Sequence, residues 1–131
     1  MKGFVGDIEK LTEENEDFRR VLYTGKHMQL VLMSIPPGGE IGEEVHEEID
    51  QFIRVEEGRG EVVIDGNRTP IEDDFAVVVP AGARHNVVNT GKEPLKLYTL
   101  YGPPEHKEGT VHRTKEEADA SHEHFDGTTT E

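Results

Sequence analysis

Four residues in the middle of the chain have the types and the spacing of metal ligands. Glu44 and His46 are two positions apart, so both side chains point to the same face of an extended strand. Gln51 follows after a short acidic turn, at the start of the next β-rich run, where a hairpin partner would bring it alongside them. His85 is distant in sequence, and only a closed or curled sheet would bring it to the same place. The four residues together predict one metal site inside such a sheet.

Short β-rich runs separated by turn signals follow an acidic segment, residues 7–17, which can be a helical turn or a loop. This pattern is expected of an all-β sandwich or barrel. Asp65-Gly66-Asn67 is a strong hairpin signal because Gly and Asn tolerate positive φ. The expected strands cover residues 20–24, 28–35, 51–56, 60–64, 75–79, 85–89 and 95–101.

One stretch near the end of the chain has the signature of a helix. Thr114 is a good N-cap, and Glu117 three residues later completes a capping box. We expect the polar residues 125–131 beyond it to be frayed.

Composition excludes several classes of partner and chemistry. The chain has 131 residues, which suits one domain, and a net charge of -14, which repels nucleic acids and anionic membranes. It has no cysteine, so disulfide and thiol chemistry are excluded. We see no signal peptide and no apolar run near the roughly 20 residues that span a bilayer. These features favour a cytoplasmic protein that binds neither nucleic acid nor membrane.

The spacing around the first three candidate ligands resembles a known motif. Five residues separate Gly38 from Glu44, one separates Glu44 from His46, four precede Gln51 and six more precede Gly58. This resembles the first motif of the cupin family, which reads Gly, five residues, His, one, His, three or four, Glu, six, Gly.

The second cupin motif has a counterpart around His85. Asp74, Pro80, Gly82, His85 and Asn89 match the pattern Gly, five residues, Pro, one, Gly, two, His, three, Asn. Fifteen residues, 59–73, separate the two motifs, which is a typical cupin spacing. We expect Pro80 and Gly82 to form a turn, and Asn89 to be a turn residue or a backbone partner and not a catalytic residue.

Three positions depart from the family pattern. Glu44 stands where the first His is usual, Gln51 where the Glu is usual, and Asp74 where a turn glycine is usual. The first two changes compensate in charge, so the resemblance still implies a single divalent ion, such as Zn, Mn, Fe, Co or Ni. The alternative is that another acid of the connection, Glu47, Glu48 or Asp50, supplies the carboxylate.

The resemblance also implies a fold and an assembly. Residues 18–25 and 101–106 are similar to small one-domain cupins labelled mannose-6-phosphate isomerase-like. The implied structure is a double-stranded β-helix, or jelly-roll barrel, with a short C-terminal helix. Residues 1–131 would form one domain, with a core barrel over about residues 18–103 and a helical tail over about 104–131. Cupins of this kind pair as homodimers.

Three functions fit these features. The preferred one is a metal-dependent isomerase or lyase whose small polar ligand is a sugar or a carboxylic acid. The others are a metal-dependent dioxygenase and a non-catalytic module that binds a small molecule. No catalytic residue can be assigned from the sequence.

The remaining polar residues leave questions open. His106 and His112 are either exposed loop histidines or parts of a flap that supplies a proton-transfer group. Strand alternation turns Arg54, and also Arg84, away from the pocket. The sequence therefore identifies no lysine or arginine that would face the phosphate group of a sugar-phosphate ligand.

Overall fold

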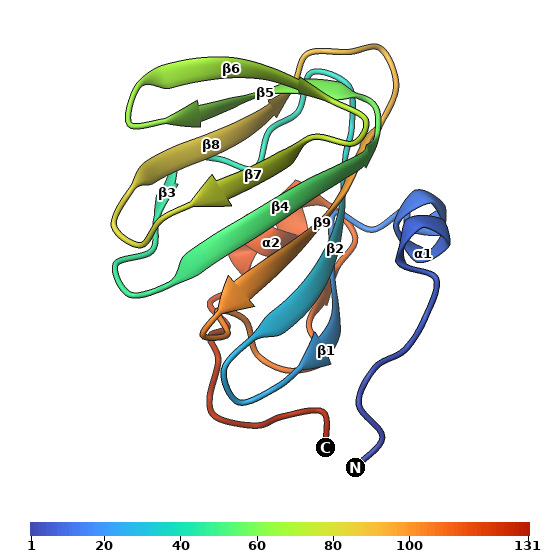
Figure 1. Cartoon of the computed structure of the whole chain (residues 1–131), viewed down its shortest axis with the longest axis vertical. Helices are drawn as coiled ribbons and strands as arrows, with labels where there is room; N and C mark the ends of the chain where they lie inside the picture. Colours follow the sequence, from blue (N-terminus) through green and yellow to red (C-terminus); the bar gives the residue numbers. More distant parts are fainter.

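The computed structural model describes residues 1–131 and contains two antiparallel sheets around a shared interior (Figure 1). In spatial order, the six-stranded sheet consists of β10 (Val111–His112), β1 (Arg19–Thr24), β2 (Gln29–Ile35), β9 (Leu95–Gly102), β4 (Asp50–Glu57) and β7 (Ala76–Val79). The four-stranded sheet consists of β3 (Glu44–Val45), β8 (Arg84–Asn89), β5 (Arg59–Ile64) and β6 (Asn67–Glu72). This arrangement confirms the predicted double-stranded β-helix.

The inward positions of the central strands change from apolar to polar along their length. Leu97 of β9 pairs with Met33 of β2 and Val55 of β4, and all three are fully buried. Further along β9, nearer one end of the barrel, the inward residue is Tyr101. Its partners on β2 and β4 are both glutamines, Gln29 and Gln51. The interior therefore has an apolar end, which forms the core, and a polar end.

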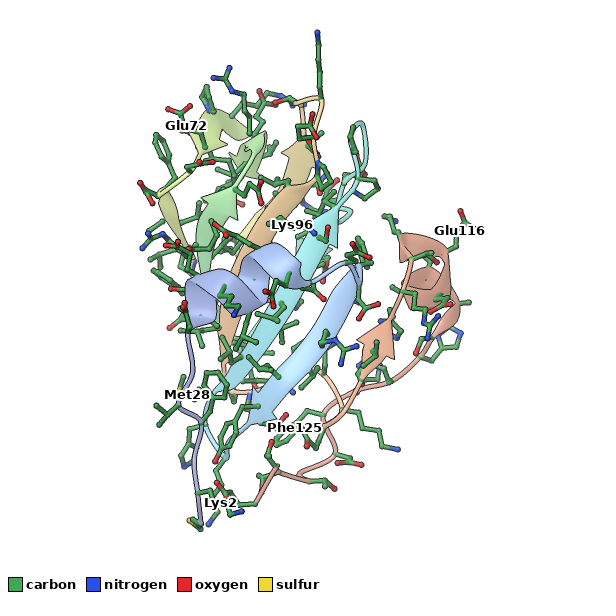
Figure 2. The ribbon with its side chains drawn as sticks, turned by 90° about the vertical axis from the view of Figure 1, so that its right-hand side faces the viewer. Lys2, Met28, Glu72, Lys96, Glu116 and Phe125 are labelled. Atoms are coloured by element: carbon green, nitrogen blue, oxygen red, sulfur yellow. The ribbon has the colours of Figure 1, made fainter.

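A helix that the sequence left open packs on part of the outer face of the larger sheet. Helix α1 (Ile8–Glu14) begins at Asp7, whose carboxylate accepts from the amide of Lys10. Figure 2 shows it lying across the strands, with Lys96 of β9 beside it. The Lys96 ammonium donates to the carbonyl of Asn15 at the end of this helix. A buried lysine on β9 is explained by this contact.

Strand β6 was absent from the predicted strands. The hairpin turn before it is present, with positive φ at Asp65 (47°) and Gly66 (83°). The strand itself is exposed except at Ile71 and contains Pro70, so its sequence shows no apolar alternation. The alternation of Glu44 and His46 assumed an extended segment where β3 forms, whereas the two-residue strand β10 was not predicted.

The C-terminal helix is where the capping box predicts it, but the tail beyond it is not frayed. Helix α2 (Lys115–Ala120) begins after Thr114, whose hydroxyl accepts from the amide of Glu117. The later tail returns to the barrel, where the amide of Thr130 donates to the carbonyl of Thr24. The expectation of fraying was wrong because it considered only the local polar composition. Neither helix has the length and apolar character required to cross a membrane.

Candidate functional site

The four-stranded sheet brings three of the predicted ligands to one place at the polar end of the interior. Glu44 of β3 lies directly opposite His85 of β8, so the two side chains share a face of the sheet. His46, two residues after Glu44, is on the same face, and its ring centroid is 5.3 Å from that of His85. Both histidines are buried. The curled sheet therefore joins two sequence regions in the way their spacing predicted.

Gln51 reaches the same interior from the opposite sheet. It pairs with Tyr101 on β9, whose ring is 5.8 Å from the ring of His46. Its amide nitrogen donates to the hydroxyl of Thr99 at 3.0 Å, which fixes the side chain. Its amide oxygen is buried and has no hydrogen-bond partner. Since buried polar atoms are normally satisfied, an orphaned oxygen at this place fits a cation ligand.

The two imidazoles are held by oxygen acceptors. His85 Nδ1 lies 3.0 Å from the carbonyl of Ala83, so an N–H there leaves Nε2 as the free lone pair. His46 Nε2 is 3.2 Å from the Glu44 carboxylate, and its Nδ1 is 3.6 Å from Glu105. No three His, Cys, Asp or Glu side chains stand in an arrangement that could hold a metal ion, so Glu44, His46 and His85 do not by themselves form a complete ligand set in this structure.

The contact between Glu44 and His46 changes the acidity of both groups. Burial alone would raise the pKa of Glu44, but the hydrogen bond and charge of His46 outweigh it and lower that pKa. Burial would lower the pKa of His46, but its contact with Glu44 and the nearby charge of Glu105 raise that pKa. The pair thus favours an ionised carboxylate beside a protonated imidazole, so a cation that binds here would have to displace the proton of His46.

A second histidine–carboxylate pair lies beyond Tyr101. His106 Nδ1 is 2.8 Å from Glu123, and its ring is edge-on to Tyr101 at 5.3 Å. Gln29 binds the backbone of His106 through both ends of its amide, at 2.7 and 3.0 Å. His106 Nε2 is buried without a partner. His106 and His112 are each only 7% exposed, so the alternative of exposed loop histidines was wrong.

The cupin domain family matches residues 31–101. This chain belongs to the cupin family. It is 49% identical over 126 residues to the uncharacterized protein YrkC of Bacillus subtilis, covering 92% of this chain and 68% of YrkC. It is 31% identical over 105 residues to the polyketide synthase CurC of Streptomyces cyaneus, covering 76% of this chain and 67% of CurC.

A crystal structure supports the same assignment. The cupin is 50% identical to protein BH2720 of Bacillus halodurans and superposes on it with a TM-score of 0.90. The match covers 92% of this chain and 96% of the other. None of these comparisons shows the mannose-6-phosphate isomerase-like subfamily, which stays a prediction.

Several polar residues of this cupin take no part in the interior. Arg54 pairs with Glu56 and Asp74, and Arg84 pairs with Glu43 on the surface, as strand alternation predicted. The alternative carboxylates of the acidic connection, Glu47, Glu48 and Asp50, are exposed. Glu44 is therefore the acid of that region that contacts a candidate ligand histidine.

Sequence reasoning missed the interior residues Arg19, Tyr101, Glu105 and Glu123. Two of them had a usable signal. Alternation in residues 18–21 places Arg19 on the same face as the buried Val21, and alternation in the predicted strand 95–101 places Tyr101 on the face of Leu97. Glu105 and Glu123 had none, since they belong to irregular segments.

None of the main hollows on the surface is lined by more than one candidate ligand. One of about 690 Å³ lies between the turn at Gly58 and residues 90–93, and no candidate ligand lines it. Another, of about 450 Å³, is lined by His85 together with Arg84 and Glu43. The chemistry of the buried side chains, and not the size of a hollow, distinguishes the polar end of the barrel.

We expect acid to lower the free energy of unfolding of this cupin through protonation of Glu123. Burial opposes ionisation, but hydrogen bonds from His106 and the amide of Lys107 lower the pKa of Glu123 from 4.5 to about 2. Its stabilising effect is therefore complete above pH 4.5 and lost as the pH falls towards 2. We expect Glu123→Gln to lose about 1 to 2 kcal/mol of unfolding free energy at pH 7, measured by urea denaturation. A difference from wild type that stays constant down to pH 3 would contradict this.

Proposed function

We propose that this cupin is a metal-dependent enzyme that acts on a small polar molecule as an isomerase or a lyase. The observation that carries the proposal is a pair of orphaned buried atoms, the Gln51 amide oxygen and His106 Nε2. Tyr101 lies between the two clusters to which they belong, since its ring contacts those of His46 and His106. The cluster of Glu44, His46, Gln51 and His85 suits a cation. The cluster of His106 and Glu123 suits proton transfer.

Glu44, His46, Gln51 and His85 would hold one divalent ion, since two imidazoles, one carboxylate and one amide oxygen suit Zn, Mn, Fe, Co or Ni. When bound, such an ion acts as a Lewis acid that polarises a carbonyl or hydroxyl oxygen. The Gln51 oxygen is held in place by the bond between its amide nitrogen and Thr99. The Glu105 carboxylate lies 3.6 Å from Nδ1 of the His46 ring.

His106 is the proposed proton-transfer residue. Glu123 accepts from its Nδ1 and orients the ring, which leaves Nε2 free for a substrate proton. Burial raises the pKa of Tyr101, so its hydroxyl stays protonated and can donate a hydrogen bond. Removal of a proton next to a polarised carbonyl is the step shared by sugar isomerases and many lyases. The likeness to CurC, which is named a polyketide synthase, supports an enzymatic role.

The test is turnover of a panel of sugar phosphates, uronates and hydroxy acids by protein loaded with each metal. We expect His106→Gln to lower kcat by roughly a hundredfold or more, within the usual contribution of a general acid or base. His27→Gln, on the exposed turn between β1 and β2, is the control that should keep full activity.

The same panel also tests the two other functions, the dioxygenase and the non-catalytic binding module. Oxygen uptake with a redox metal would make the protein a dioxygenase. Stabilisation by a panel compound without turnover with any metal would overturn the enzyme proposal in favour of a binding module.

The family resemblance also implies a homodimer, and the outer face of the larger sheet offers an apolar surface for it. Val78 is 65% exposed and Met28 50%, and the rings of Phe52 and Tyr98 lie near them on the same sheet. We expect native mass spectrometry to give twice the chain mass of 14.7 kDa. Val78→Asp should give monomers, whereas Thr69→Asp on the exposed β6 should not. A monomeric wild type would contradict the proposal.

A further inference from the structure

A buried guanidinium lies in the interior without a carboxylate partner. Arg19 is the first residue of β1 and is only 7% exposed. It pairs with Met33 on β2 and His112 on β10, so its side chain is on the inward face of the sheet. Its Nε has no hydrogen-bond partner, and none of the ion pairs of the protein includes it. The arginine is thus buried with its charge unpaired.

The guanidinium contacts two neutral groups. Its Cζ is 5.4 Å from the centroid of the Phe18 ring. Its Nη1 is 3.3 Å from His112 Nδ1. Burial lowers the pKa of His112, and the charge of Arg19 lowers it further, so the imidazole is neutral and accepts from the guanidinium. This hydrogen bond orients the guanidinium but does not neutralise it.

The charge of Arg19 reaches both clusters, since it helps to lower the pKa of Glu44 and that of Glu123. An unpaired charge in a protein interior costs several kcal/mol, so buried charges normally have a partner. Here the nearby carboxylates Glu44 and Glu123 contact His46 and His106 and not Arg19. The guanidinium thus keeps an unpartnered donor that is free to engage an anion from outside the chain.

We propose that Arg19 binds the anionic group of the substrate, so that this cupin acts on a small carboxylate or phosphate and not on a neutral sugar. The planar fork of a guanidinium matches two oxygens of either group. His106 and the His46–His85 end of the interior would then face the rest of the molecule. This inference rests on the proposed function and deepens it by naming the charge of the substrate.

The test is calorimetric titration with malonate and with inorganic phosphate, at fixed ionic strength, beside the neutral analogue malonamide. The proteins are wild type, Arg19→Gln, Arg19→Lys and the control Arg84→Gln, whose guanidinium is on the surface. Metal content is measured for each protein. Arg19→Lys keeps the charge but loses the fork, and it decides the question if Arg19→Gln does not fold.

We expect wild type to bind at least one anion at least tenfold more tightly than malonamide. Arg19→Gln should raise that Kd at least tenfold, Arg19→Lys about threefold or more, and Arg84→Gln not at all. Which of the two anions binds more tightly distinguishes carboxylate from phosphate substrates. Metal content should be equal in all four proteins.

Equal affinity for malonate, phosphate and malonamide in wild type would overturn the inference. So would unchanged anion affinity in the folded Arg19 variants, which would make Arg19 a counterion for the interior carboxylates. Anion binding that depends on Arg19 in a wild type that takes up no metal would support this inference while the metal proposal fails.

Discussion

Wild-type protein purified without an affinity tag or a chelator should hold about one metal ion per chain, and His46→Ala/His85→Ala should hold almost none. The double variant removes both imidazoles and leaves only Glu44 and Gln51, two oxygen ligands that water can replace. Loss of a residue that merely supports a ligand already costs about 10- to 100-fold in affinity, so loss of two ligands should cost more. Inductively coupled plasma mass spectrometry measures the content and identifies the metal.

Two further variants make this result specific. His27→Ala removes an exposed histidine and should leave the metal content unchanged. Gln51→Glu replaces the amide with the carboxylate that the family motif has there, and we expect it to bind metal more tightly than wild type. A wild type that is empty and rejects added metals would rule out the metal proposal and put the binding-module function first.

Replacing Asn89 should destabilise the fold more than any other change to a polar residue of β8. Asn89 is 1% exposed, and its amide nitrogen donates to the carbonyls of Ile35 and Glu93 at 2.8 and 2.9 Å. Its amide oxygen accepts from the amide of Gly91 at 2.9 Å. It thus ties β8 to the end of β2 and to the loop before β9. We expect Asn89→Ala to lose about 3 kcal/mol of unfolding free energy, about 1 kcal/mol for each bond.

Chemical denaturation measures this loss, and Asn86→Ala is the matched control. Asn86 is on the same strand and accepts a single hydrogen bond, from the amide of Gly42 at 2.9 Å. We expect its replacement to cost about 1 kcal/mol. Equal effects of the two changes would contradict the role of Asn89 as a three-way bridge. Folded Asn89→Ala protein should still bind metal, since the side chain contacts no candidate ligand.

The sequence by itself determined what depends on local spacing. The two-residue alternation of Glu44 and His46 placed them on one face, and the turn before His85 placed that residue at the start of a strand. Asp74 stands where the motif has glycine, and its φ of 73° is in the left-handed region that favours glycine. The backbone conformation of the motif is therefore kept although the residue differs. The capping box at Thr114 located the C-terminal helix. Each of these depends on interactions within a few residues, which a sequence pattern records directly.

Tertiary structure alone decided which polar residues share the interior. His106 is buried because Gln29, on a distant strand, binds its backbone, and its partner Glu123 comes from the tail. Arg19 faces inward because β1 pairs with β2 on one side and with β10 on the other. Strand β6 forms by pairing with β5 although its own residues show no alternation. The energies of these contacts depend on pairing across long stretches of chain, which no local pattern specifies.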